Sequence, residues 1–485
     1  MTVTRTTRPS VEQRKARGAR ARDRTPRGSH SRWTPAPNRP DPVGLLERQD
    51  RTREPDLVPV RYGRMLVSPF AFYRGAATIM AADLSQTPVA GLDAQLCGDA
   101  HLLNFGAFAS PERTLLFDLN DFDETLPGPF EFDVKRMAAS FTIAGRGNGY
   151  SPADADAAAA ASLSAYRSAM AEFAQMPTMD IWYSRMSEAD LLSAVRSTVA
   201  RTAKQRKGKE AREAARQLAK AGKRAEKSAG KARARDSLQA LSRLGELVDG
   251  QYRIISQPPA VVPARDLAGA YGVSPGELRK VIRSQFRDYR ASLPDDRRHL
   301  LEHFEIVDVA RKVVGVGSVG TRAFIVLLQG RDERDPLFLQ VKEAMPSVLE
   351  AHLGKSRYRH HGERVVQGQR LMQAASDIYL GWAKGAEPGR YYYWRQLRDM
   401  KGSALVELMT PAALAFYARI CGWTLARAHA RSGDPVALAG YLGNGDAFDR
   451  AVTDFASRYA DQNERDFEKF SAAVKSGRIE ARTGV

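Results

Sequence analysis

Residues 97–104, CGDAHLLN, and residues 120–124, NDFDE, are the two stretches of this 485-residue sequence that bear most directly on its fold. In the first stretch, Asp99 and Asn104 stand five positions apart in a loop that follows an apolar segment. In the second, Asp121 and Asp123 end the β-like run that begins at Thr114. Because Asp and Asn are common turn formers, one stretch alone indicates no more than a loop. The two together favour a site where one carboxylate takes a proton and other oxygens hold a metal.

The five-residue spacing is the one used by catalytic loops of phosphoryl-transfer enzymes. The text GDAHLLN followed by NDFDETLPGPFEFD, residues 120–133, resembles the catalytic half of aminoglycoside and choline-type phosphotransferases, which are protein-kinase-like. This resemblance implies that Asp99 is the catalytic base and that Asn104 and Asp121 are Mg²⁺ ligands. It also implies that Asp133 is a structural residue bracing the loop. Of the remaining acids, Asp118 is interpreted as structural and Asp123 as a further metal ligand.

The match to those enzymes is incomplete at one position and extends into a second resemblance. His101 falls on a histidine of the motif, whereas Cys97 stands where those enzymes commonly have His. The wider text includes RMLVSPFAFYRG, residues 64–75, GQRLMQAASDIYLGW, residues 368–382, and ARAHARSGD, residues 426–434. Through these stretches, nearly all of residues 56–470 resembles the bacterial domain-of-unknown-function family 2252, whose name states no activity.

A nucleotide-binding unit is predicted downstream, since fewer than fifty ordered residues are expected before Asp99. Gly315, Gly317 and Gly320 lie between apolar β-runs, and Lys342 follows on the predicted strand LFLQVKEA, residues 337–344. Glycines at a hairpin tip let backbone N–H groups approach phosphates, and a strand-borne lysine supplies positive charge. The glycines alone fit a plain hairpin equally well, but with Lys342 phosphate binding is favoured. We expect Glu350 or Glu363 to pair with Lys342.

The order of these parts predicts an α+β, protein-kinase-like two-lobe fold that is circularly permuted. The predicted helix of residues 410–429 resembles the helix that leads into the catalytic loop of ordinary kinases, yet it comes late in the chain. Permutation is permissible because domain termini commonly lie close together at the surface. It requires Lys342 and Gly317 to lie near Asp99 and Asp121.

Four regions are predicted along the chain. Residues 1–55 form a disordered basic arm, because their composition buries little apolar surface. Residues 56–304 form the helical catalytic region, with a basic helical excursion at 186–246 that projects into solvent. Residues 305–400 form the nucleotide-binding β region, and residues 401–485 are helices that complete the catalytic lobe. Arg61, Arg64 and Arg74 flank an aromatic segment, where core ion pairs are favoured over contact with an anionic substrate.

The net charge of +18 is concentrated in two segments. Residues 1–40 carry +9 and residues 201–235 carry +11, which leaves −2 for the rest of the chain. These segments are candidates for weak contact with nucleic acid or acidic surfaces, although a solvated tail explains them as well. Two cysteines without zinc-site spacing predict neither disulfide nor structural zinc. The sequence contains no apolar run that predicts a membrane span and no secretory signal, so we expect a cytoplasmic protein.

The function expected from these patterns is ATP- and Mg²⁺-dependent transfer of a phosphoryl group to a hydroxyl or amine of a small-molecule acceptor. The alternatives are a non-catalytic nucleotide-binding regulator, nucleotidyl transfer to a protein, and a nucleic-acid-associated protein that acts through its basic segments. The expected residues are catalytic Asp99, Asn104 and Asp121, nucleotide-binding Gly315, Gly317, Gly320 and Lys342, and metal-binding Asn104, Asp121 and Asp123.

Overall fold

The computed structural model describes residues 9–205, 209–233, 237–248, 250–267, 274–313, 315–397 and 400–484. It has an α+β architecture, as predicted. The first helices are α1 Val11–Arg24, η1 Arg27–Ser31, α2 Pro42–Asp50, η2 Pro55–Leu57, α3 Val58–Met65, α4 Pro69–Gly75 and α5 Ala77–Leu84. The next elements are β1 Asp93–Leu96, η3 Leu102–Asn104, β2 Phe105–Ala109, β3 Leu115–Leu119, β4 Leu126–Pro129, α6 Glu131–Gly147, α7 Pro152–Phe173, α8 Thr178–Tyr183, α9 Glu188–Gln205 and α10 Lys209–Arg233.

Among the described residues, the second half of the chain contains most of the strands and the longest helix, α19. The sheet region comprises α11 Ser237–Leu244, β5 Gly245–Val248, β6 Gln251–Ile254, β7 Val261–Pro263, α12 Ala264–Leu267, α13 Pro275–Ala291, α14 Asp295–Leu301, β8 Glu305–Lys312, β9 Ala323–Gln329, β10 Pro336–Glu343, α15 Glu350–Leu353, α16 His361–Met372, β11 Gly381–Lys384 and β12 Tyr391–Gln396. The chain then continues through β13 Gly402–Ser403, η4 Val406–Leu408, α17 Pro411–Ser432, α18 Pro435–Leu442 and α19 Ala447–Lys475.

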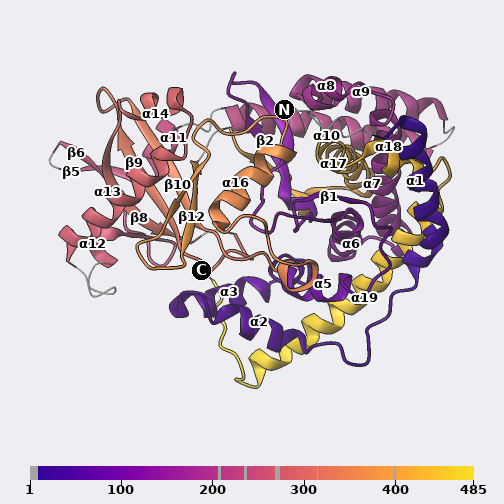
Figure 1. Ribbon diagram of the computed structural model, residues 1–485, viewed down its shortest axis with the longest axis horizontal. Coiled ribbons are helices and arrows are strands. Elements are labelled where there is room, and N and C mark those ends of the chain that lie inside the picture. Colours follow the sequence, from indigo (N-terminus) through magenta and orange to yellow (C-terminus); the bar gives the residue numbers. More distant parts are fainter. Residues whose placement is uncertain are drawn as a thin grey trace, which may run out of the picture.

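An antiparallel six-stranded sheet in the order β11-β12-β10-β9-β8-β7 forms one part of the molecule. Both of its faces are covered by apolar side chains: α13 and α14 contribute Tyr289 and Leu301 to one core, and α11 contributes Leu241 to another. Figure 1 shows this sheet with α11–α14 on the left and the remaining helices on the right. Helix α16 packs on β11 and β12 and also contacts α17.

The helical part surrounds α17, which packs closely along α7. Thr410 caps α17 by accepting a hydrogen bond from the Ala413 N–H, and Pro411 fits the first turn because its missing N–H is not needed there. The far end of α17 lies against the start of β1. The Gln95 N–H donates to Ser432 Oγ over 3.2 Å, and a Cβ on Gly433 would lie 3.1 Å from the Asp93 carbonyl. The late helix therefore ends next to the strand that enters the 97–104 loop.

The prediction of a disordered basic arm is wrong for residues 9–55, while residues 1–8 lie outside the described part of the chain. Helix α1 begins with a capping box at Ser10 and packs on α18, where a Cβ on Gly18 would come within 2.1 Å of the Ala437 carbonyl. Arg39 pairs with Asp83 and Asp466, which are both buried. The basic residues are thus ordered by acids distant in sequence, which local composition does not reveal.

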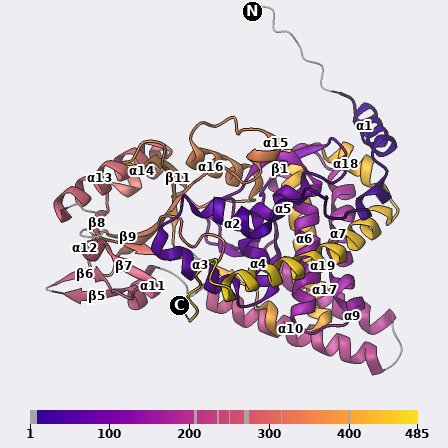
Figure 2. The same ribbon diagram turned by 90° about the horizontal axis from the view of Figure 1, so that it is seen from below.

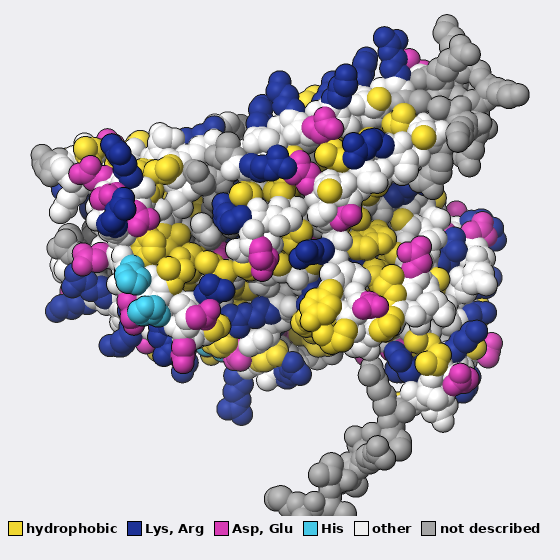
Figure 3. All heavy atoms as spheres, turned by 90° about the horizontal axis from the view of Figure 1, so that it is seen from above, with side chains coloured by type: hydrophobic (Ala, Val, Ile, Leu, Met, Phe, Trp, Pro, Cys, Tyr) yellow, Lys and Arg dark blue, Asp and Glu magenta, His cyan; other side chains and the backbone are white. Residues whose placement is uncertain are grey.

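The predicted solvent-projecting excursion is also corrected, although part of 201–235 lies outside the described residues. Helices α9 and α10 form a hairpin, and α10 contacts α17, β2 and β13 (Figure 2). Leu218 and Ala232 are buried in these contacts. The outward face carries exposed Lys220 and Lys227, and Figure 3 shows Lys and Arg side chains gathered along this edge. Among the described helices, none is long and apolar enough to span a membrane.

Candidate functional site

The 97–104 loop is held by a carboxylate from the first turn of α6. Asp133 accepts hydrogen bonds from the Cys97 N–H at 2.8 Å and the Gly98 N–H at 3.0 Å, and His429 of α17 lies 3.3 Å from it. This is the bracing role that the resemblance implies for Asp133. Gly98 has φ +84°, and a Cβ there would come within 2.2 Å of the Glu124 carbonyl, so the turn requires glycine. Both cysteines are buried and free.

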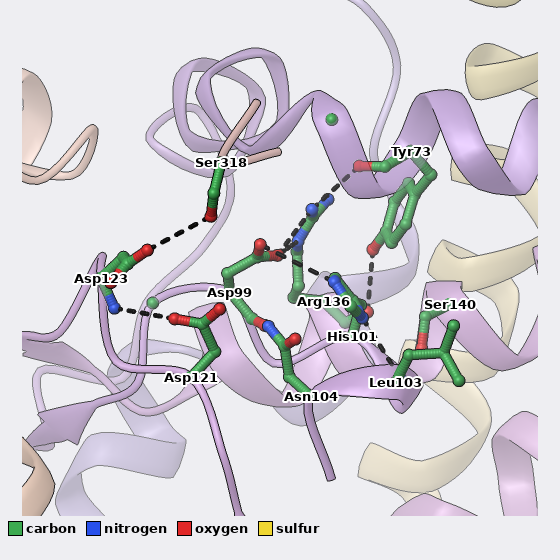
Figure 4. A network of polar contacts seen from close by, with 12 residues as sticks. Tyr73, Asp99, His101, Leu103, Asn104, Asp121, Asp123, Arg136, Ser140 and Ser318 are labelled. Atoms are coloured by element: carbon green, nitrogen blue, oxygen red, sulfur yellow. Dashed lines mark hydrogen bonds and ion pairs between the residues drawn. The ribbon is translucent and has the colours of Figure 1, made fainter. Parts of the chain in front are cut away.

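Asp99 leaves this loop toward the interior of the site (Figure 4). Its Oδ1 accepts hydrogen bonds from Arg136 Nε and Nη2, each at 2.7 Å, whereas Oδ2 lies 3.9 Å from His101 Nε2. Burial raises the pKa of Asp99, and the Arg136 guanidinium opposes that shift. Burial, with Arg74 and Arg136 nearby, lowers the pKa of His101 well below its usual value. His101 is therefore neutral, and its contact with Asp99 is not an ion pair.

Asn104 connects the two motifs. Its side-chain Nδ2 donates to the Asp99 carbonyl at 2.6 Å, and its own carbonyl accepts from the Asn120 N–H at 2.8 Å. Asp118 lies on β3, three residues before Asp121, and is buried in the core, where it pairs with Arg427 over 2.5 Å. This geometry confirms a structural position. The 120–124 segment consequently starts beside the 97–104 loop.

Asp121 and Asp123 form a half-buried acidic pair that shares one buried cation. Lys342 Nζ lies 2.7 Å from Asp123 Oδ2 and 3.8 Å from Asp121 Oδ2, and the lysine side chain is 4% exposed. Burial and the charge of Asp123 raise the pKa of Asp121. Burial opposes ionisation of Asp123 as well, but Lys342 outweighs it and lowers that pKa overall. The proximity of Lys342 to Asp121 that the permutation hypothesis required is therefore present.

The glycine loop between β8 and β9 reaches the same place. Ser318 Oγ lies 3.4 Å from Asp123 Oδ2, as Figure 4 shows, and Gly317 lies beside the Arg74 carbonyl. Gly315 and Gly320 have φ of +68° and +88°, which favour glycine. The loop contains Ser318 between the predicted glycines, so the tip places a hydroxyl and flexible backbone next to the acidic pair.

Neither glutamate expected to pair with Lys342 does so among the described residues. Glu350 lies 3.9 Å from both Arg364 and His361, and Glu363 stands in the first turn of α16. Lys342 is instead neutralised by the 121–123 acids because β10 aims it across the site. The position of α16 facing the acids is occupied by Arg364, which donates to the Asp123 and Thr125 carbonyls.

Sequence reasoning missed three residues that complete the site. Tyr393 of β12 stands opposite Lys342 in the sheet register, and its hydroxyl donates to Asp123 Oδ1 at 2.6 Å. Arg136 holds Asp99, and Ser318 contacts Asp123. The strand-like run YYYWRQ, residues 391–396, was the available signal for Tyr393. If this strand pairs with the strand of Lys342, one of its residues must lie directly opposite the lysine.

Comparison with known proteins gives a family and nothing more specific. No curated protein and no solved structure matches the chain. A family model described as "Uncharacterized protein conserved in bacteria (DUF2252)" matches residues 53–473, and the chain therefore belongs to this family.

Proposed function

We propose that this protein is an ATP- and Mg²⁺-dependent phosphotransferase with a circularly permuted, protein-kinase-like fold, acting on a hydroxyl or amine of a small molecule. The observation that carries the proposal is the meeting of Lys342 and Ser318 with Asp121 and Asp123 beside Asp99. Lysine, glycine tip and acids come from segments about two hundred positions apart, and a single phosphoryl-transfer cleft needs all of them.

The permuted order is supported by the contact between α17 and β1. An ordinary kinase runs directly from such a helix into its catalytic loop. Here Ser432 and Gly433, at the end of α17, adjoin Gln95 and Asp93 of β1, which enters the 97–104 loop. The two halves are thus adjacent in space where the unpermuted chain would join them.

The donor set fits Mg²⁺, which prefers oxygen ligands and usually takes one or two carboxylates together with phosphates and water. Asp121 and Asp123 provide carboxylates, although Asp121 Oδ1 also accepts the Asp123 N–H. The side-chain oxygen of Asn104 stays available because its Nδ2 donates to the Asp99 carbonyl. No group of three or more His, Cys, Asp or Glu suited to a metal occurs among the described residues. When bound, Mg-ATP would supply the transferable phosphoryl group and neutralise the acidic pair.

The protein side chains divide the remaining work between them. Asp99 keeps Oδ2 for the proton of the acceptor, because Arg136 fixes Oδ1 and orients the carboxylate. Its raised pKa, caused by burial, makes it a stronger base than a free aspartate. Lys342 has three N–H donors, so it can serve phosphate oxygens while it contacts Asp123. The glycine tip adds backbone N–H groups without side-chain obstruction.

The test is an Asp99-dependent product. Wild type, Asp99→Asn and a control variant at an exposed acid, Asp296→Asn, are incubated with Mg-ATP and a bacterial metabolite extract. Mass spectrometry then looks for phosphorylated or adenylylated products. We expect products with wild type and the control, none with Asp99→Asn, and thermal stabilisation of all three proteins by Mg-ATP. Absence of any nucleotide effect on wild type would contradict the proposal.

A non-catalytic nucleotide-binding regulator is the second candidate. The Arg136–Asp99 ion pair favours it, since Arg136 opposes the rise in the pKa of Asp99 that burial causes. It predicts stabilisation by Mg-ATP in wild type and Asp99→Asn alike, with no product from either protein.

A further inference from the structure

Arg74 differs from the other cations around the site because the structure gives it no ionic or hydrogen-bonded partner among the described residues. Arg136 is paired with Asp99, Lys342 with Asp123, and Arg61 with Asp50. Arg74 Nε is buried without any partner. Burial lowers the pKa of Arg74, which indicates that the unbalanced charge is costly. The core ion pair expected for these arginines is thus confirmed for Arg61 and absent for Arg74.

The position of Arg74 is at the edge of the proposed cleft. It belongs to the last turn of α4, and its carbonyl lies 3.1 Å from where a Cβ on Gly317 would be. The preceding residue, Tyr73, accepts a hydrogen bond through its carbonyl from Arg136, which holds Asp99 (Figure 4). The backbone of Arg74 therefore lies beside the glycine tip, and the residue before it contacts the arginine that holds the proposed base.

The charge that acts most on Arg74 is that of Asp99. Asp99 and Glu407 of η4 favour the charged form of Arg74, while burial opposes it. The nucleotide phosphates already have Lys342 and the glycine tip on the other side of the site. A further cation next to Asp99 would be matched by a negative charge on the molecule that Asp99 activates.

We propose that Arg74 binds a phosphate or carboxylate group of the acceptor, so that the substrate of this enzyme is an anionic hydroxyl or amino compound. A guanidinium suits this task, because its planar fork donates two parallel hydrogen bonds to either group. Binding would also supply the direct ionic partner that the described residues do not give Arg74. This inference rests on the proposed function only for the statement that the anion belongs to a phosphoryl acceptor.

The experiment uses the full-length chain as wild type, Arg74→Met, Arg74→Lys and a control, Arg331→Met, whose side chain is 83% exposed. Calorimetry measures binding of inorganic phosphate, glycerol 3-phosphate and glycerate, with neutral glycerol for comparison. A non-hydrolysable ATP analogue with Mg²⁺ is measured separately. We expect wild type and the control to bind at least one anion and not glycerol. Arg74→Met should weaken that binding at least ~10-fold, and Arg74→Lys less.

Two readouts separate this role from others. The ATP analogue should bind Arg74→Met as it binds wild type; loss of the analogue instead of the anions would assign the group to the nucleotide and overturn the proposal. Arg74→Met should unfold at the same temperature as wild type or higher, because no partner is left unpaired, and a marked decrease would indicate a structural role and overturn it too. The proposal is also overturned if the wild-type protein binds none of the three anions. Failure of the analogue to bind wild type, with Arg74-dependent anion binding intact, would refute the phosphotransferase and retain the anion site.

Discussion

Replacing Lys342 by Met tests whether the acidic pair depends on one buried cation. At an effective dielectric constant of about 20, the attraction between Lys342 and Asp123 at 2.7 Å is ~6 kcal/mol, and that with Asp121 at 3.8 Å is ~4 kcal/mol. Desolvation offsets much of this attraction, so loss of one partner from such a cluster typically costs about 3–5 kcal/mol. We expect Lys342→Met to lower the free energy of urea unfolding by that amount.

A double-mutant cycle with Asp123→Asn isolates the interaction. Asp123→Asn alone should cost less, since Lys342 retains Asp121. The double variant leaves one carboxylate without a cation instead of two, so its loss should fall short of the sum of the single losses by about 2 kcal/mol. Additivity within about 0.5 kcal/mol would refute the contact, and with it the joining of the two segments in one site.

The same cycle has a defined pH dependence. Lys342 lowers the folded-state pKa of Asp123 below its ordinary value of 3.8. The stabilisation is therefore complete above that ordinary value and is lost as pH falls through the lower, folded-state pKa. The deficit of Lys342→Met should be largest near neutral pH and should shrink toward pH ~3. A deficit that does not change with pH would show that lost packing, rather than lost charge, is responsible.

Three further predictions concern the surroundings of the site. Burial raises the pKa of Glu124 to about 7 from 4.5, so the stability that its neutral form contributes at low pH is lost as pH rises between these values. Glu124→Gln should therefore reduce the difference in the free energy of urea unfolding between pH 5 and pH 8 by up to ~3 kcal/mol. Asp133→Asn should cost about 2–3 kcal/mol, since the amide cannot accept from both loop N–H groups; unchanged thermal unfolding would contradict the bracing role. Arg39→Met should lower the free energy of unfolding by about 3–5 kcal/mol, because it leaves Asp83 and Asp466 without their cation. Arg20→Met, at an exposed position, should leave it unchanged. Equal effects of the two variants would support the original prediction that this segment is disordered.

The sequence was most informative where chemistry is local. Asp99 and Asn104 lie within one loop, and the strand pattern around Lys342 fixes which side of the sheet it occupies, so their approximate places could be predicted. The partner of Lys342 could not be predicted, because it depends on how the sheet sits over the 120–124 segment. Resemblance to ordinary kinases pointed to a glutamate on the next helix, and the chain uses Asp123 instead.

Composition misled most at the N-terminus, because a count of charges contains no information about their partners. A basic, proline-containing segment is disordered only if the rest of the chain offers it no acids or carbonyls. Here Arg39 reaches two buried aspartates, and Arg22 donates to carbonyls at the end of α18, where a helix presents unsatisfied acceptors. The near-neutral body of the chain thus conceals the acidic partners of its basic beginning.

Residues near the N-terminus also contribute to the site, because they form hydrogen bonds with carbonyls of the glycine loop. Arg53 donates to the Val319 carbonyl, the Glu54 N–H donates to the Gly320 carbonyl at 2.7 Å, and Arg64 donates to the Gly315 carbonyl at 2.6 Å. These bonds satisfy carbonyls of the loop and leave its tip facing Asp123. A glycine loop gains phosphate affinity only if its flexible backbone is held ready, since ordering it on binding costs entropy. Arg53 and Glu54, which composition assigned to the disordered arm, are therefore part of what positions the proposed nucleotide site.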